Sequence, residues 1–596
     1  MTSPFALRLQ FLRDQLTQSS YDGFLVPMAD EFQSEYVPAS AQRIQFLSGF
    51  TGSAGFIIVL KDKAGFFTDG RYVLQAHQQV PTDLFQIYDS GVFSPTAWLI
   101  EHAPPYSKIA YDPWLHTAES ITKLTKTMNE KNILLMAVTT NPIDAIWKDR
   151  PPAPTAPLVA YDIRFAGKSS SDKRAMIAEH LAKKNLSAAV LTDPTSVAWL
   201  LNIRGGDVAN TPLPLSFAIV DAQGAVQLFV DPRKGAANLS HHLGCDVSIL
   251  PIDQFSSALE HCGSYQLPIR IDPTEAASAI VDKLKSAHIK LDLGDDPCLL
   301  PKACKNDIEI EGMRAAHRRD GAALVTFLSW LEKAQIAGDV SEISADEKLA
   351  SFRAQTPLYQ GPSFDTISGV GAHGAIIHYR ATPTTNRLLE TGQLYLLDSG
   401  GQYLDGTTDV TRTIALGLPT QEMRDRYTRV LKGHIALAAI RFPEGTAGSD
   451  LDVLARQYLW AVGLDYNHGT GHGVGSYLGV HEGPQGISKR NHIALVPGMV
   501  VSNEPGYYKT GHYGIRLENL QLVTSSLDLP PAEKKMLGFE SLTLVPFDRH
   551  LVDRSLLTEE ERLWINTYHT KVRDQLNPLL DNNTRQWLDA ATQPLA

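Results

Sequence analysis

Two segments in the last third of the chain each combine apolar strand-like residues, a glycine-containing turn and a pair of acids. The first, QLYLLDSGGQYLDGTTDVTRTIAL, places Asp398 after an apolar run and Asp409 further along. The second, GMVVSNEPGYYKTGHYGIRLENLQLV, repeats this plan with Glu504 and Glu518. Because each segment is predicted to fold back as a β-hairpin, acids that are distant in sequence can meet in space. The shared plan indicates an internal two-fold relationship.

Four carboxylates set against apolar strands need compensation, because unpaired buried charges are costly. One interpretation places the acids at strand ends in water, or pairs them with Arg412 and Arg516. The other is a metal centre, to which His472 would add an imidazole. Four carboxylates balance two divalent cations, and such a set favours Mn²⁺, with Co²⁺, Zn²⁺ or Fe²⁺ as alternatives. The four cysteines all lie between residues 245 and 304, so this region offers no thiolate ligand.

The glycine-rich stretch YNHGTGHGVGSYLGVHEG, residues 466–483, allows three interpretations. A phosphate-binding loop of the dinucleotide type should follow a strand, but the preceding DLDVLARQYLWAVG is predicted to be helical. A zinc-binding helix should read H-E-x-x-H, but Gly, Thr and Gly separate His468 from His472. The remaining interpretation is that this stretch contributes some of the residues of a larger site. The neighbouring acids favour it.

Composition excludes some classes of function. A net charge of −11 argues against a nucleic-acid-binding protein, which needs excess Lys and Arg. The sequence contains no uninterrupted apolar run of about 18 residues, so no membrane span is expected. The N-terminus reads as an amphipathic helix rather than a signal peptide, and the cysteines form no CxxC pair. We therefore expect a cytoplasmic protein with reduced thiols.

The length of 596 residues predicts several domains. We place them at residues 1–155, 156–305 and 306–596. The proline-rich stretch KDRPPAPTAPLVAYD marks the first boundary, because proline disfavours both helices and central strands. The alternation of helices and strands then restarts, which indicates two α/β domains of similar size. A long amphipathic helix, NDIEIEGMRAAHRRDGAALVTFLSWLEKA, is predicted to open the third, α+β domain.

The motifs LLDSGGQYLDGTTDVTRT, HGTGHGVGSYLGVHEGP, NEPGYY and GIRLENL, in this order, closely resemble those of the pita-bread metallopeptidases. GAIIHYR, upstream of the first acid, fits the same pattern. Within these enzymes the chain is most similar to the aminopeptidase P family in its long, three-domain form. FLSGFTGSAG, AWLLNIRGGDV and FESLTLVPFDRHLVD resemble that form's first domain, second domain and C-terminal extension. The resemblance implies two creatinase-N-like α/β domains followed by a C-terminal pita-bread catalytic domain.

The resemblance also implies a role for each residue that matches a metal-binding motif. Asp398 is expected to be a terminal ligand of one metal ion. His472 and Glu504 are expected to complete the other. Asp409 and Glu518 are expected to bridge the two ions, which the family leads us to expect as Mn²⁺, with Co²⁺ or Zn²⁺ possible.

Further residues are matched to substrate-handling roles. His378 corresponds to a histidine that hydrogen-bonds the substrate or shuttles protons, and His481 to one that contacts the substrate carbonyl. His468 corresponds to a histidine that lines the pocket. Arg516 corresponds to an arginine that orients the bridging glutamate, and Tyr508 is expected beside it.

The implied function is a metal-dependent exopeptidase that removes the first residue from peptides with proline at position two, by attack of a hydroxide bridging two metals. The implied partners are such peptides and a second copy of the chain, with no nucleic acid and no membrane. Prolidase, which cleaves Xaa-Pro dipeptides, is the main alternative, but the length and C-terminal extension favour the aminopeptidase. Creatinase and peptide- or histone-binding modules of this fold work without metal, and the intact ligand set argues against both.

Overall fold

The computed structural model describes most of the chain, namely residues 3–235, 239–525 and 533–595. The chain divides into two compact units, which we describe separately. The first comprises residues 1–163 and 168–299, and the second residues 164–167 and 300–596.

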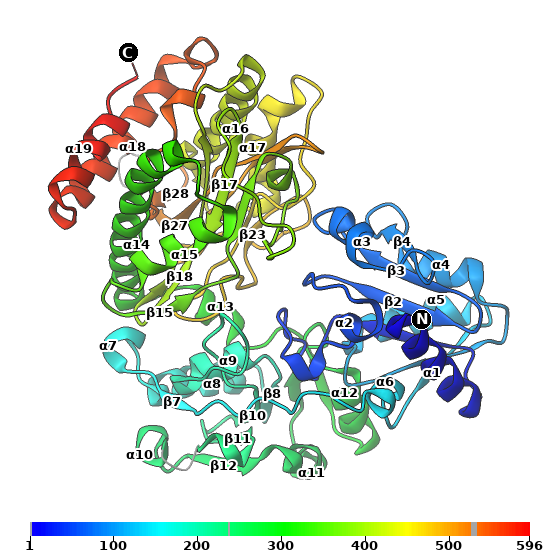
Figure 1. Cartoon of the computed structure of the whole chain (residues 1–596). Coiled ribbons are helices and arrows are strands. Elements are labelled where there is room, and N and C mark those ends of the chain that lie inside the picture. The colour runs from blue at the N-terminus through cyan, green and yellow to red at the C-terminus, as the bar shows by residue number, and fades with distance from the viewer. Residues whose placement is uncertain (1–2, 236–238, 526–532, 596) are drawn as a thin grey trace. The chain divides into compact units, whose positions relative to one another are not determined.

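The first unit contains two six-stranded sheets that share one topology (Figure 1). The strand order is β4-β3-β2-β1-β5-β6 in one and β12-β11-β10-β8-β13-β14 in the other. In each sheet, three central strands form an antiparallel meander, and parallel pairings add the other three. The sequence indicated two similar α/β domains only through a pattern of helices and strands that starts again. The structure shows that the two sheets have the same topology.

The strands of the first sheet are β1 (Gly23–Pro27), β2 (Phe56–Leu60), β3 (Ala64–Thr68), β4 (Gln86–Asp89), β5 (Lys108–Tyr111) and β6 (Leu134–Ala137). Those of the second are β8 (Ala188–Leu191), β10 (Ser216–Asp221), β11 (Val226–Val230), β12 (Val247–Pro251), β13 (Ile269–Ile271) and β14 (Leu291–Leu293).

Helices cover both faces of the first sheet, which explains its nearly continuous apolar strands. Phe24 and Val26 of β1 join one core cluster, and Leu25 joins the other, because successive side chains point to opposite faces. One face packs on α1 (Pro4–Gln18), α2 (Arg43–Ser48), α3 (Val73–Gln79) and α6 (Pro142–Ile146), and the other on α4 (Pro95–His102) and α5 (Ala118–Asn129). The predicted N-terminal amphipathic helix is confirmed as α1, with Leu9, Leu12 and Leu16 buried.

The long helix α14 (Asp307–Ala334) opens the main part of the second unit, as predicted. Asn306 caps it by accepting hydrogen bonds from the backbone N–H groups of Ile308 and Glu309, and the Glu309 carboxylate accepts one from the Asn306 backbone N–H. This reciprocal capping sets where the helix begins. Its buried face includes Met313, Ala316, Ala323, Leu324, Phe327 and Leu331.

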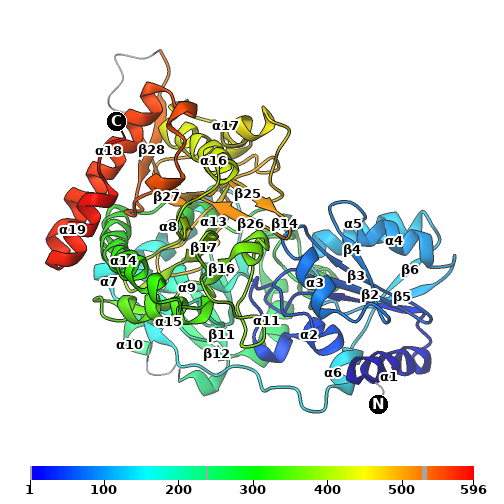
Figure 2. The same ribbon diagram turned by 45° about the horizontal axis from the view of Figure 1, so that its top comes forward.

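Helices surround the strands of the second unit (Figure 2). Helices α16 (Gln421–Ala439) and α17 (Gly448–Trp460) pack side by side, and α18 (Glu559–Leu576) and α19 (Asn582–Ala591) pack against α14. The central strands are β16 (Ile367–Val370), β17 (Leu394–Ser399), β20 (Val410–Ala415), β24 (Val500–Asn503), β27 (Asn519–Ser525) and β28 (Met536–Ser541).

In the first acid-bearing segment the predicted pairing is present, since strands β17 and β20 pair antiparallel with Asp398 opposite Thr411. Between them in sequence, β18 (Gly401–Tyr403) and β19 (Gly406–Thr407) form a separate short hairpin. The second segment also departs from the predicted single hairpin. Strand β24 pairs with β27, and between them β25 (Gly506–Lys509) and β26 (Tyr513–Arg516) form a separate hairpin. Pro505, which has no N–H to donate, stands between β24 and β25 and interrupts the ladder.

All four cysteines are thiols rather than disulfides, as predicted. In the part of the chain that the structure describes, no helix combines the length and the apolar character needed to cross a membrane. The three-domain limits at residues 155 and 305 remain our proposal.

Candidate active site

The acids and the histidine that the sequence singled out lie at the ends of strands in the second unit. Asp398 is the penultimate residue of β17, and Asp409 directly precedes β20. His472 ends the short strand β22 (Gly471–His472), and Glu504 follows β24. Glu518 stands between β26 and β27. Side chains from far apart in the sequence are thus carried on rigid elements, which suits a site that needs fixed geometry.

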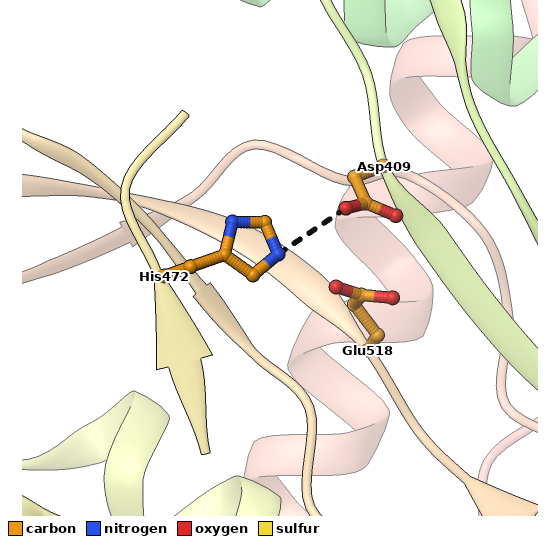
Figure 3. Close-up of side chains that lie close together, drawn as sticks. All are labelled: Asp409, His472 and Glu518. Carbon is orange, nitrogen blue, oxygen red and sulfur yellow. Dashed lines mark ion pairs between the residues drawn. The ribbon is translucent and has the colours of Figure 1, made fainter. Parts of the chain in front are cut away.

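Three of these residues form a compact group of potential metal ligands (Figure 3). One ligand atom from each of Asp409, His472 and Glu518 lies within 4.8 Å of the others, and their side chains point toward one another. His472 Nε2 is 3.4 Å from Asp409 Oδ2 and 3.6 Å from Glu504 Oε1. The imidazole therefore faces two of the predicted acids directly.

Arg516 joins the remaining acid to this group. Its Nη2 donates a hydrogen bond of 2.6 Å to Asp398 Oδ2, and its Nε donates to Thr411 Oγ1 at 3.2 Å. The Thr411 hydroxyl in turn donates to Glu518 Oε2 at 2.7 Å. Arg516 thus contacts Asp398 directly and reaches Glu518 through Thr411. Thr411 was not predicted from the sequence, because a threonine in a strand is ordinary.

The site holds four carboxylates, which carry more negative charge than Arg516 balances. Burial raises the pKa of Asp398 to about 6; the Arg516 charge opposes this shift and Asp409 adds to it. Burial, followed by repulsion from Asp409 and Asp398, raises the pKa of Glu518 well above its ordinary value. Burial also raises the pKa of Glu504. Such a set of carboxylates is stabilised by added positive charge.

His472 responds in the opposite sense. Burial by itself lowers the pKa of its imidazole, but the hydrogen bond to Asp409 and the charge of Glu504 outweigh it and raise the pKa to about 9. Its Nδ1–H donates to the carbonyl oxygen of Gly473 at 3.0 Å. This bond orients the ring so that Nε2 faces the acids, which is the usual arrangement of a metal-binding histidine.

The polar atoms of the site fit divalent cations. Asp398 Oδ1 and Asp409 Oδ1 are both buried, and neither has a hydrogen-bond partner among the described residues. Buried carboxylate oxygens without partners are costly, and a coordinated cation removes that cost. The donor set of four carboxylates and one imidazole is one that Mn²⁺, Co²⁺ and Zn²⁺ accept.

Two further predicted histidines lie beside this group. The His481 ring packs edge-to-face on the His472 ring, with centroids 4.3 Å apart. His468 Nδ1–H donates to the Gly469 carbonyl at 2.7 Å, so its Nε2 accepts from the Tyr508 hydroxyl at 2.9 Å. That hydroxyl also accepts a bond of 2.6 Å from Arg516 Nη1.

His378 lies in the turn that follows the short helix η7 (Gly371–Ala375). Helix η7 packs tightly against β26, since a β-carbon on Gly514 would lie 1.7 Å from the Gly374 carbonyl oxygen. The segment that leads to His378 is thereby set beside the strand that carries Arg516. The role of His378 stays a proposal.

A buried glutamate holds this segment in place. Glu342 accepts hydrogen bonds from the backbone N–H groups of Val370 at 2.9 Å and Arg387 at 3.1 Å. It also accepts from His373 Nδ1 at 2.8 Å and from the Tyr379 hydroxyl at 3.0 Å. His373, which is outside the predicted site, therefore helps to anchor the loop. Glu342 was not singled out, because its partners are distant in sequence.

The chain matches known families along almost its full length. Residues 311–525 match metallopeptidase family M24, and residues 535–595 match the C-terminal region of that family. Residues 8–145 and 149–309 each match the creatinase/prolidase N-terminal domain. The fold is therefore that of an M24 metallopeptidase preceded by two creatinase-type domains.

Relatives that match over nearly the full length show which M24 metallopeptidases this chain resembles. A probable Xaa-Pro aminopeptidase P of Laccaria bicolor is 41% identical over 99% of this chain and 93% of its own. Aminopeptidase P1 of Arabidopsis thaliana is 37% identical over 96% of this chain and 97% of its own. The chain belongs to the Xaa-Pro aminopeptidase P family.

Solved structures agree with this placement. The X-prolyl aminopeptidase of Caenorhabditis elegans, described as a cytosolic enzyme with a di-nuclear active site, matches with a TM-score of 0.95 and 36% identity over 100% of both chains. An Xaa-Pro dipeptidase from Bacillus anthracis matches with a TM-score of 0.52 and 25% identity, over 64% of this chain and 99% of that one.

Proposed function

We propose that this protein is an Xaa-Pro aminopeptidase, which releases the first residue of peptides with proline at position two. The observation that carries the proposal is the buried group of Asp409, His472 and Glu518, linked through Thr411 and Arg516 to Asp398. Likeness to aminopeptidases over the whole chain supports the same reaction.

Five residues would hold two divalent cations, with Mn²⁺ favoured over Co²⁺ and Zn²⁺. Asp398 would hold one ion, His472 and Glu504 would hold the other, and Asp409 and Glu518 would contribute to both. The excess of buried carboxylates and the two unpartnered carboxylate oxygens support this assignment. The chemistry that such cations supply is activation of water as a nucleophile and polarisation of a carbonyl.

The other site residues bind and orient the peptide. His481, packed on the His472 ring, donates to the carbonyl oxygen of the first residue as negative charge develops there. His468 and Tyr508 form part of the pocket wall. The leaving proline nitrogen carries no hydrogen and needs a proton when the bond breaks, a transfer that we assign to His378. Arg516 keeps Asp398 ionised and oriented through its 2.6 Å bond.

The competing function, an Xaa-Pro dipeptidase, is tested by substrate length. Incubating the Mn²⁺-loaded protein with Arg-Pro-Pro and with Arg-Pro should give arginine from the tripeptide and much less from the dipeptide. The dipeptidase structure covers only 64% of this chain, whereas the aminopeptidase structure covers all of it, which supports this expectation. Chromatography of the released arginine measures both reactions. Preferential cleavage of Arg-Pro would contradict the proposal and identify the protein as a prolidase.

Replacing His378 with alanine tests the proton-transfer assignment. We expect kcat for Arg-Pro-Pro to fall by about 100-fold, the size typical of a lost general acid, with metal content unchanged. Steady-state kinetics and metal analysis of the same preparation provide the measurement. His512→Ala is the matched control, because His512 has no proposed role and should leave kcat unchanged. Parallel loss of metal and activity in His378→Ala would instead make His378 a structural residue.

The cytosolic relative and the family resemblance lead us to propose a cytoplasmic location and a homodimer. Gel filtration with light scattering tests the oligomeric state, and a monomer with full activity would exclude the dimer as a requirement.

A further inference from the structure

A buried ion pair lies next to the proposed substrate-binding histidine. Lys305 Nζ donates to Glu482 Oε1, and the two side chains are only 1% and 2% exposed. Lys305 also donates to the carbonyl oxygen of Lys302 at 3.0 Å. The other carboxylate oxygen, Glu482 Oε2, is buried and has no hydrogen-bond partner among the described residues. Lys305 thus supplies the positive charge that makes burial of this carboxylate tolerable.

Glu482 closes the loop that joins the two neighbouring histidines. It directly follows His481, and its backbone N–H donates to the carbonyl oxygen of Gly473 at 2.8 Å. Gly473 directly follows His472. A β-carbon on Gly473 would lie 2.0 Å from the Glu482 carbonyl oxygen, so the two backbones are in close contact. A displacement of Glu482 therefore moves His481 relative to His472.

Lys305 is held independently of that loop. Its backbone N–H donates to the carbonyl oxygen of Gly498 at 2.9 Å, just before β24. The next residue, Asn306, caps the long helix α14. The backbone of Lys305 is thus fixed by the start of α14 and by the segment that leads into β24. Its ammonium group is therefore held in place beside the loop that contains His481 and Glu482.

We propose that the Lys305–Glu482 pair is a positioning element that sets the place of His481 against the metal-binding face of His472. This role rests on the proposed aminopeptidase function. Among the described residues, the side-chain hydrogen bonds of the pair run to each other and to Lys302, so we assign it an action through His481 rather than on the substrate itself. The pair joins residues 177 positions apart in the sequence, which is why no local pattern points to it.

Steady-state kinetics of Glu482→Asp and Lys305→Met test the proposal on the Mn²⁺-loaded full chain with Arg-Pro-Pro. The aspartate keeps the charge but shortens its reach by one methylene, and methionine removes the cation. For both, we expect kcat to fall by about 10-fold or more, with KM and metal content nearly unchanged, because a small misplacement of a reacting group costs rate. Lys305→Arg, which keeps the cation, should retain most of the activity.

Two comparisons separate positioning from general destabilisation. Lys234→Met breaks another buried ion pair, with Asp207 in the first unit, and should leave kcat of the folded enzyme unchanged. In a His481→Ala background, Glu482→Asp should cause no further loss of kcat, because the group that it positions is already gone.

The proposal is overturned if Glu482→Asp keeps full kcat. It is also overturned if Glu482→Asp lowers kcat by the same factor in the His481→Ala background as in the wild type. An arginine at position 305 that is as damaging as methionine would also overturn it, since charge would then not matter. The same assay is first run on the wild-type protein. If the wild type fails to cleave Arg-Pro-Pro, the proposed function itself is refuted.

Discussion

Asp409→Asn should lower kcat for Arg-Pro-Pro by at least about 1,000-fold, because the proposed bridging carboxylate becomes a neutral, weakly coordinating amide. The side chain keeps its shape, so circular dichroism should show an unchanged fold. Asp409 is 4% exposed, its Oδ2 faces His472, and its Oδ1 has no partner among the described residues. Metal analysis should show that less than the full complement of Mn²⁺ is retained.

Asp574→Asn is the matched control for this experiment. It makes the same chemical change on the exposed side of α18 and should leave both activity and metal content unchanged. Turnover by Asp409→Asn at the wild-type rate in saturating Mn²⁺ would refute the bridging role. Loss of the fold would place Asp409 among structural residues instead.

Arg412→Met should lower the free energy of unfolding of the second unit by about 3–5 kcal/mol, the cost of disrupting a buried charged network. The Arg412 guanidinium is buried in β20, lies over the Phe547 ring and, among the described residues, donates to uncharged oxygens. Its acceptors are the carbonyl oxygens of Thr411, Glu518, Val545 and Pro546, together with Asn519 Oδ1 and the Tyr568 hydroxyl.

These bonds tie the C-terminal extension to the site, since Val545 and Pro546 lie in the extension and Glu518 is a proposed ligand. Methionine keeps the apolar contact with Phe547 but leaves the carbonyl oxygens without their donor. Urea unfolding followed by tryptophan fluorescence measures the effect. Arg554→Met, at an exposed position, should change stability by no more than about 0.5 kcal/mol. Equal stabilities of the two variants would show that Arg412 does not anchor the extension.

The helices and strands of this protein follow from short-range signals. Apolar periodicity predicted α14, and the Asn306 capping box explains why it starts where it does. The alternation of strand and turn predicted the antiparallel pairing of β17 with β20. The second acidic segment was predicted as one hairpin, and the β25–β26 hairpin was missed, because Pro505 interrupts a segment with strand-favouring residues on both sides, Val500 and Val501 before it and Tyr507 and Tyr508 after it.

The candidate site was predictable as a set of residues but not as a network. The motif order named the acids and the histidines, since each stands in its own recognisable local sequence. The link from Arg516 to Asp398 and Thr411, and the four donors on Glu342, join residues from different elements. Such contacts depend on how the strands and helices pack in the tertiary structure. They cannot be predicted from the local sequence around each residue.

The sequence by itself determined the family and the order of the domains, and it named the residues that we propose as metal ligands, because all of these depend on contiguous motifs. Only the tertiary structure decided which charges meet. Arg412, Lys305 and Glu482 resemble surface residues in the sequence, yet all three are buried and paired across more than one hundred positions. The physical reason is that burial of a charge is set by the whole fold around it, and its partner is whichever opposite or polar group the packing brings within reach.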